Sequence, residues 1–310
     1  MSKLTAVLAV VAVLLPQTRA AERPKILGVA HFAVYVSDLP RAREFYQGLL
    51  GYEEAFNVTR EDAGVDLAFV KINDSQWIEL VNRPSAGEGQ LHHIALYTDD
   101  AERMRRYLAA KGVTVPATLE TGVTGDKSFA VTDPDGHSVE IVEYQPGSRT
   151  SRTKGQHLPP SRIAGHAMHV GILVGSLERA NAFYADILGF REFWRGSAAN
   201  SKTLSWVNMR VPDGADYLEF MLYDELPAAA NRGSAHHICL VVANADDAIV
   251  KIHERPERKA YQRLLSIRTG INRKRQINLF DPDGTRVELM EPETIDGQPA
   301  PSSPLPPPRK

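Results

Sequence analysis

"HVGILVGSLERANAFYADILGF" (residues 169–190) repeats, 138 positions later, the layout of "HFAVYVSDLPRAREFYQGLLGY" (residues 31–52). Both stretches begin with a histidine and alternating apolar residues, which predict a strand, and both continue into a segment with helical periodicity. Weaker copies begin at His93, "HIALYTDDAERMRRYLAAKGV", and at His237, "HICLVVANADDAIVKIHERP". The chain therefore contains four copies of one strand-helix opening.

The helix that follows the first strand is amphipathic. Its apolar residues recur at intervals that place them on one helical face, namely Leu39, Ala42, Phe45, Tyr46 and Leu49. Asp38, Asp99 and Ser176 stand where a helix N-cap is expected.

Each copy then runs into two or three further strands. "FAVTDPDGHSVEIVEY" and "INLFDPDGTRVELMEP" show the last two strands of the even copies, because Asp-Pro-Asp-Gly between apolar alternations predicts a hairpin. The sequence thus predicts an α+β fold of four βαβββ units, paired into two domains with concave mixed sheets. The first domain is expected over residues 27–146 and the second over 165–293, joined by a polar linker over 147–164.

Composition bounds the class of protein. The 310 residues suit two ordinary domains, and 43% apolar with 24% charged residues is typical of a soluble globular chain. A net charge of −2 gives no general attraction to nucleic acid or anionic membrane. One cysteine, Cys239, excludes an internal disulfide and a thiolate-rich zinc site.

Both ends of the chain are expected to lie outside the fold. Lys3, the apolar run "LTAVLAVVAVLL" and small residues near Ala20 and Ala21 predict a secretory signal peptide over residues 1–21. The run is shorter than the roughly 20 residues that span a bilayer. We therefore expect a secreted or periplasmic protein, with no membrane association after cleavage. The proline-rich tail, residues 294–310, is expected to be disordered.

Strand alternation places one histidine and one glutamate of every unit on the same face of its sheet. Each histidine opens a first strand opposite apolar neighbours, and each glutamate lies between two apolar residues of a last strand, 47 to 51 positions later. The pairs are His31 and Glu79, His93 and Glu140, His169 and Glu219, and His237 and Glu288.

A single strand histidine is more often a satisfied polar residue than a ligand, and a single glutamate is usually solvated. Four histidines and four glutamates that all share one phase of the strand alternation require a common cause. A buried carboxylate is costly unless it is paired or bound to metal, and two histidines and two glutamates around one cation would satisfy all four. His92 and His236 are out of phase and are interpreted as structural.

These features resemble the vicinal oxygen chelate superfamily, which includes glyoxalase I, bleomycin resistance proteins and extradiol dioxygenases. The resemblance rests on "FYxxxLG" after the first helix and "DPDGxxVE" at the end of the even units. It implies glyoxalase/dioxygenase-like domains, each holding one divalent metal in a cleft. Zinc, nickel, manganese and iron all suit imidazole and carboxylate ligands.

The resemblance to glyoxalase I implies a lyase or isomerase that chelates two neighbouring oxygens of a small substrate and stabilises an enediolate. Glu79, Glu140, Glu219 and Glu288 are then the candidates for the catalytic base. One alternative is an Fe(II) ring-cleavage dioxygenase. Asn278 and Ala130 occupy the slots where such enzymes carry a tyrosine, which counts against it. Another alternative is a non-catalytic small-molecule binding protein.

The fourth unit carries a basic segment after Pro256. Arg273 and Arg275, with Asn278, are candidates for binding an anionic substrate, because guanidinium groups bind carboxylate and phosphate with two hydrogen bonds. The alternative is a solvated basic surface. One short cluster without interleaved aromatic residues argues against nucleic-acid binding. The sequence leaves open whether the clefts close within each domain or across a homodimer or a domain swap.

Overall fold

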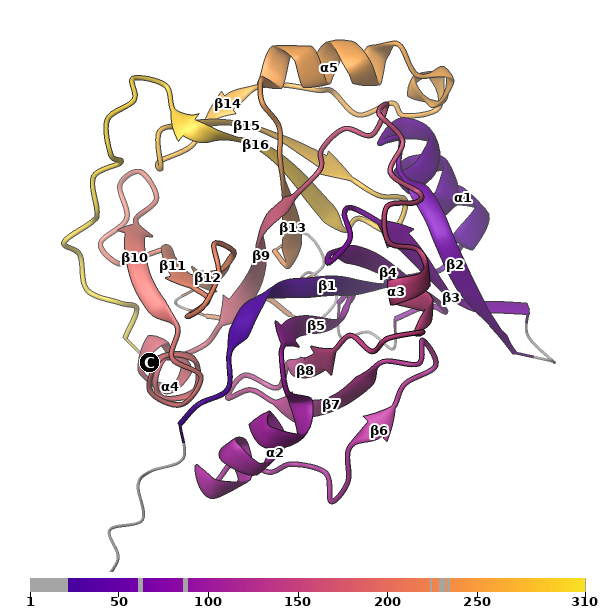
Figure 1. Cartoon of the computed structure of the whole chain (residues 1–310). Helices are drawn as coiled ribbons and strands as arrows, with labels where there is room; N and C mark the ends of the chain where they lie inside the picture. Colours follow the sequence, from indigo (N-terminus) through magenta and orange to yellow (C-terminus); the bar gives the residue numbers. More distant parts are fainter. Residues whose placement is uncertain are drawn as a thin grey trace, which may run out of the picture.

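The computed structural model describes residues 22–60, 64–85, 89–223, 225–228, 232 and 235–309. Two eight-stranded mixed sheets, one in each domain, make up most of it (Figure 1). The predicted α+β fold of four βαβββ units in two curled sheets is confirmed. No helix in these ranges is long and apolar enough to cross a membrane. The signal peptide expected over residues 1–21 lies outside them.

The first domain contains two βαβββ units. The first unit consists of β1 (Ile26–Val36), α1 (Leu39–Arg43), the π-helix η1 (Glu44–Leu49), β2 (Glu53–Arg60), β3 (Gly64–Lys71) and β4 (Trp77–Asn82). The second consists of β5 (Leu91–Thr98), α2 (Ala101–Ala110), β6 (Glu120–Thr121), β7 (Lys127–Thr132) and β8 (Ser138–Glu143). A short helix, α3 (Arg149–Arg152), follows in the linker.

The second domain repeats this order. Its first unit consists of β9 (Ala167–Val174), α4 (Leu177–Asn181), the π-helix η2 (Ala182–Ile187), β10 (Arg191–Gly196), β11 (Trp206–Arg210) and β12 (Tyr217–Leu222). Its second consists of β13 (His237–Val241), α5 (Ala245–His253), the 3-10 helix η4 (Pro256–Lys259), β14 (Arg268–Thr269), β15 (Lys274–Phe280) and β16 (Arg286–Thr294).

The two units of each domain join along their first strands. The strand orders are β2-β3-β4-β1-β5-β8-β7-β6 and β10-β11-β12-β9-β13-β16-β15-β14. β1 pairs antiparallel with β5, and β9 pairs antiparallel with β13. Each first strand also pairs in parallel with the last strand of its own unit, for example β1 with β4. These pairings place all histidine- and glutamate-bearing strands of a domain at the centre of one sheet.

Side-chain caps begin the helices. Asp38 Oδ1 accepts a hydrogen bond from the backbone N–H of Arg41, and Ser176 caps α4 in the same way. The cap of α2 is Asp100 and not Asp99, one residue later than predicted. Asn244 caps α5.

The domains share one hydrophobic core. A single cluster of buried side chains runs from Ile26 in β1 to Leu289 in β16 and includes residues of both sheets. Two tyrosines of the "FYxxxLG" motifs cross the seam between the domains. Tyr46 donates a hydrogen bond to Asp281 (3.1 Å), and Tyr184 donates one to Asp133 (2.9 Å). Each domain therefore binds the Asp-Pro-Asp-Gly hairpin of the other.

The C-terminal tail, residues 294–309, lies against the second domain in the structure. The backbone N–H of Leu204 donates to the carbonyl of Pro306 (2.8 Å), and that of Ser303 donates to the carbonyl of Arg195 (2.9 Å). The Trp194 indole donates to the Pro301 carbonyl (3.2 Å). Figure 1 shows the tail in yellow, running along the outer side of β10. These long-range hydrogen bonds hold a segment that has no periodicity of its own.

Candidate metal centres

The structure brings four predicted residues of the first domain together on one face of its sheet. His31 lies on β1, Glu79 on β4, His93 on β5 and Glu140 on β8. The Nε2 atoms of His31 and His93 are 2.6 Å apart. Glu140 Oε2 lies 3.0 and 3.2 Å from them, and Glu79 Oε2 lies 3.5 and 3.8 Å from them. We refer to these four residues as centre 1.

The second domain repeats this arrangement with His169 on β9, Glu219 on β12, His237 on β13 and Glu288 on β16; we refer to them as centre 2. The two Nε2 atoms are 3.1 Å apart. Glu219 Oε2 lies 4.0 Å from that of His169 and 3.4 Å from that of His237. Glu288 Oε2 lies 3.5 and 3.9 Å from them. Each centre is thus complete within a single domain.

Burial shifts the ionisation of centre 1. It raises the pKa of Glu79 to about 7; the His93 charge opposes this shift and Glu140 adds to it. Burial also opposes ionisation of Glu140, but hydrogen bonds from His31 and His93 outweigh it and hold its pKa well below the usual value. One carboxylate is therefore paired with the imidazoles, and the other lacks a full counter-charge.

Burial is still deeper in centre 2, where both histidine side chains are fully enclosed. It lowers the pKa of His169 and of His237 to about 3, and Arg286 contributes to both shifts. Burial raises the pKa of Glu288. Neutral imidazoles are the form that binds metals.

The donor sets fit a divalent cation. In each centre, two imidazole nitrogens and a carboxylate oxygen lie within 4.8 Å of one another: His31, His93 and Glu140 in one, and His169, His237 and Glu288 in the other. Glu288 Oε2 is buried and has no hydrogen-bond partner, although it points toward two imidazole nitrogens. An unpaired buried carboxylate oxygen is costly, and a cation at this point would satisfy it.

The two centres open into clefts of different size and lining. The cavity at centre 1 has a volume of about 110 Å³ and is bounded by residues such as Phe69, Trp77 and Tyr144. The cavity at centre 2 has a volume of about 260 Å³ and is bounded by Trp194, Trp206 and polar side chains. A dry cavity of 150 Å³ accepts benzene. The second cleft therefore has room for a small substrate beside the centre.

Asn278 lines the second cleft, as predicted, but Arg273 and Arg275 do not. Arg273 pairs with Asp296, and Arg275 pairs with Asp246 (2.6 Å) and Glu291 (3.2 Å). The structure therefore places these two arginines outside the lining of the second cleft, contrary to the position expected for them. Arg275 shares the alternation of the buried Ile277 and Leu279, so its side chain lies on the side of α5 and not in the cleft.

The sequence interpretation missed two residues beside centre 2, Arg286 and Cys239. Arg286 and Arg268 line the second cleft. Arg286 stands two residues before Glu288 on β16, so the alternation that identified the glutamate also placed the arginine on the same face. Cys239 is buried next to Glu288, and this proximity raises the pKa of its thiol further than burial alone. Cys239 carried no signal in the sequence, because single buried cysteines are common in cores.

His92 and His236 remain outside the centres, in agreement with their structural interpretation. His92 Nδ1 lies 2.6 Å from His93 Nδ1 and packs against Tyr35. His236 packs edge-on against His137 across the seam, with ring centroids 5.1 Å apart.

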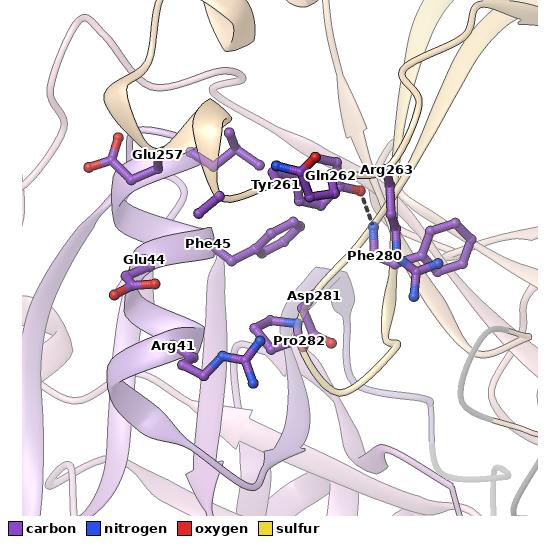
Figure 2. Close-up of a pocket in the computed structure, with 12 residues that line it drawn as sticks. Arg41, Glu44, Phe45, Glu257, Tyr261, Gln262, Arg263, Phe280, Asp281 and Pro282 are labelled. Atoms are coloured by element: carbon purple, nitrogen blue, oxygen red, sulfur yellow. Dashed lines mark hydrogen bonds between the residues drawn. The ribbon is translucent and has the colours of Figure 1, made fainter.

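Another cavity, of about 410 Å³, lies away from both centres, at the seam between the domains. Figure 2 shows Phe45 and Arg41 of the first domain facing Tyr261, Phe280 and Asp281 of the second. Tyr261 Oη accepts a hydrogen bond from the Phe280 N–H (3.0 Å). Acidic and basic side chains are mixed around the groove, and nothing in it selects a ligand chemistry.

Comparison with known proteins agrees with this architecture. The family model of the Glyoxalase/Bleomycin resistance protein/Dioxygenase superfamily matches residues 28–141 and 166–289. The uncharacterized protein YwbC of Bacillus subtilis (strain 168) is 30% identical over 127 residues, which cover 37% of this chain and 96% of YwbC. The 2-epi-5-epi-valiolone epimerase of Actinomyces sp is 26% identical over 153 residues, 40% of this chain and 84% of that enzyme.

Solved structures share the two-domain fold at low sequence identity. Homoprotocatechuate 2,3-dioxygenase from Arthrobacter globiformis superposes with a TM-score of 0.65 at 16% identity, over 90% of this chain and 84% of the dioxygenase. The 2,3-dioxygenase LapB from Pseudomonas sp. KL28 gives 0.64 at 16% identity, over 90% of this chain and 97% of LapB. At this identity, the likeness concerns the fold alone.

Proposed function

Because the chain belongs to the Glyoxalase/Bleomycin resistance protein/Dioxygenase superfamily, we propose that it is a divalent-metal-dependent lyase or isomerase of a small molecule with two neighbouring oxygens. The observation that carries this proposal is the convergence of two imidazoles and two carboxylates in each cleft. Superfamily membership alone supports a metal-dependent enzyme without naming its reaction.

The protein residues have separate tasks in this proposal. His31, His93 and Glu140, and their counterparts His169, His237 and Glu288, would hold the metal. When bound, a divalent metal supplies electrostatic stabilisation to the negative charge that develops on an enediolate. A carboxylate at the edge of the set removes a proton from the carbon next to a substrate carbonyl and returns it to the neighbouring atom. Glu79 is a candidate for this base in centre 1, because its Oε2 lies farther from both imidazoles than that of Glu140. In centre 2 the two carboxylates lie at similar distances from the imidazoles, so Glu219 and Glu288 are both candidates.

An Fe(II) dioxygenase is the second candidate, and one observation favours it. The tightest group in each centre is two histidines and one glutamate, the ligand set of many non-haem iron oxygenases. Asn278 in the second cleft and Ala130 on β7 supply no acid–base group where the resemblance leads one to look for a tyrosine. This counts against ring cleavage.

Substitution of one histidine in each centre tests the proposal. We expect His31→Ala and His169→Ala each to weaken metal binding at the altered centre by about 100-fold, because each removes a direct ligand. Metal content by mass spectrometry after gel filtration measures this loss. His157→Ala is the matched control, since His157 is a partly exposed histidine that contacts Glu53 and belongs to neither centre.

The reaction type is tested on the metal-loaded protein. Exchange of a proton next to the carbonyl, followed by NMR in deuterated water on a panel of small hydroxyketones, would support the isomerase or lyase. Oxygen uptake with a panel of catechols would instead support the dioxygenase. Ligand binding that a chelator leaves unchanged would indicate a non-catalytic binding protein. Unchanged metal content in both histidine variants would contradict the metal centres altogether.

We further propose that the protein acts in the periplasm or outside the cell, on the basis of its N-terminal sequence. Cell fractionation tests this location. It bears on the reaction because the thiol cosubstrate implied by the resemblance to glyoxalase I is cytosolic, which favours other small oxygenated substrates.

A further inference from the structure

The two centres differ at one residue of their last strands. "DPDGHSVE" in the first domain carries Ser138 where "DPDGTRVE" in the second carries Arg286. Arg286 is the direct partner of His237 in the parallel pairing of β13 with β16. An arginine is thus placed beside a ligand histidine in centre 2, whereas centre 1 has a serine at the matching position.

Arg286 contacts the nitrogen of His237 that faces away from the centre. Its Nη2 atom lies 2.6 Å from His237 Nδ1, and the carbonyl oxygen of Ala235 lies 3.0 Å from the same atom. A guanidinium only donates and a carbonyl only accepts, so Nδ1 can serve one of these two groups but not both. While Nδ1 accepts from Arg286, the ring hydrogen sits on Nε2, and Nδ1–H can donate to Ala235 only when Arg286 leaves. A metal-binding imidazole requires the reverse, with a free lone pair on Nε2 and the hydrogen on Nδ1.

A glycine allows this position of the His237 ring. Gly171 is the partner of His237 on β9, and a Cβ added there would lie 2.0 Å from His237 Cε1. The matching partner of His93 in centre 1 is Ala33. The His93 ring therefore lacks the space that the His237 ring uses. The centres thus differ on both strands that flank the histidine, at Gly171 against Ala33 and at Arg286 against Ser138.

The positive charge of Arg286 also opposes metal binding at centre 2. Arg286 places a positive group beside the buried carboxylates of centre 2, where it offsets part of their charge. The described lining of the cleft at centre 1 includes no lysine or arginine. A divalent cation that enters centre 2 lies about one imidazole ring away from the positive charge of Arg286. A cation that enters centre 1 has no such charge in the described lining of its cleft.

We propose that the two centres bind metal unequally, and that Arg286 makes them unequal. Centre 1 takes a divalent metal directly. Centre 2 takes one only when Arg286 leaves His237, whose Nδ1–H then donates to the Ala235 carbonyl. The released guanidinium stays in the larger cleft beside Arg268, where it can bind an anionic group of the ligand. This inference rests on the proposed function in that both centres are metal sites.

Cobalt titrations of single-centre variants test the proposal. His169→Ala leaves centre 1 intact, and His31→Ala leaves centre 2 intact. By isothermal titration calorimetry at one fixed pH, we expect Co²⁺ to bind at least tenfold more tightly to the His169→Ala protein. Adding Arg286→Ser to His31→Ala should tighten Co²⁺ binding at least tenfold. Adding Ser138→Arg to His169→Ala should weaken it at least tenfold.

Arg268→Ser, added to His31→Ala, is the matched control. Arg268 lines the same cleft but is exposed and lies on β14, so its loss should change the Co²⁺ affinity less than twofold. Equal affinities of the two single-centre proteins, or an Arg286→Ser effect no larger than that of Arg268→Ser, would overturn the proposal. If Arg286→Ser does not fold, Ser138→Arg decides alone. Undiminished cobalt binding in both histidine variants would instead refute the proposed metal centres.

Discussion

Replacing Asp133 with alanine should lower the free energy of unfolding by about 3–5 kcal/mol, the range found when one member of a buried charged network is removed. Asp133 is 5% exposed and accepts four hydrogen bonds. They come from the backbone N–H groups of Asp135 (2.9 Å) and His137 (2.8 Å), from His137 Nδ1 (2.8 Å) and from the Tyr184 hydroxyl (2.9 Å). Alanine would leave several of these donors buried without a partner.

Urea unfolding at pH 7 measures this loss. Arg179→Ala is the matched control, because Arg179 is 60% exposed and makes only long contacts with the same hairpin, to Asp135 and to the Pro134 carbonyl, both at 3.4 Å. An exposed ion pair of this kind contributes about 0–1 kcal/mol. If Asp133→Ala costs no more than Arg179→Ala, the hairpin is not held by this network.

Asp281, the counterpart of Asp133, should destabilise the protein by about 3 kcal/mol as the pH rises from 4 to 7. Burial raises its pKa from 3.8 to about 6, and Asp283 adds to the shift, against hydrogen bonds from Thr285 and Tyr46. Between these two pKa values the unfolded chain has released the proton and the folded chain still holds it. Stability therefore falls with rising pH through this range and levels off above pH 6.

Asp281→Asn removes the ionisation. Its Oδ1 can still accept from the backbone N–H groups of Asp283 and Thr285, and its Nδ2 can donate to the Tyr46 hydroxyl oxygen. We expect this variant to match the wild type in stability near pH 4 and to exceed it by about 3 kcal/mol at pH 7. Chemical denaturation at a series of pH values measures the difference. A stability difference that stays constant from pH 4 to 7 would contradict the expectation.

For Asp133, the pH dependence of stability should have the opposite sign, and Asp133→Asn should remove it. Burial opposes the ionisation of Asp133, but the hydrogen bond and charge of His137 outweigh it and lower its pKa below 3.8. Its contribution to stability is complete above the unfolded pKa and is lost as the pH falls through the lower folded value. The contrast arises because His137 corresponds to Thr285 in the other hairpin, and threonine supplies no positive charge.

The centres were predictable because strand geometry is local. Side chains alternate between the two faces of a strand, so His31 and Glu79 reveal their common face without knowledge of the fold. The same rule, applied to Ile277 and Leu279, would have excluded Arg275. Arg273 lies outside this rule, because it stands in the turn before β15 and has a φ of 60°.

Features that depend on contacts between residues far apart in the chain could not be predicted from the sequence. The tail lies against the second domain because Pro301 and Pro306 meet Trp194 and Leu204, and its own composition gives no sign of those contacts. Pairing of β1 with β5 within a domain, and not across a dimer, likewise depends on packing between whole units. A homodimer remains a prediction.

The crossed Tyr–Asp contacts and the shared core have a consequence for the integrity of the chain. Each half contributes one tyrosine and one hairpin aspartate to the seam, and one cluster of buried apolar side chains includes residues of both halves. A polypeptide nicked between residues 153 and 160 should therefore stay assembled and melt in a single calorimetric transition. The two fragments, once separated, should regain their structure only when mixed.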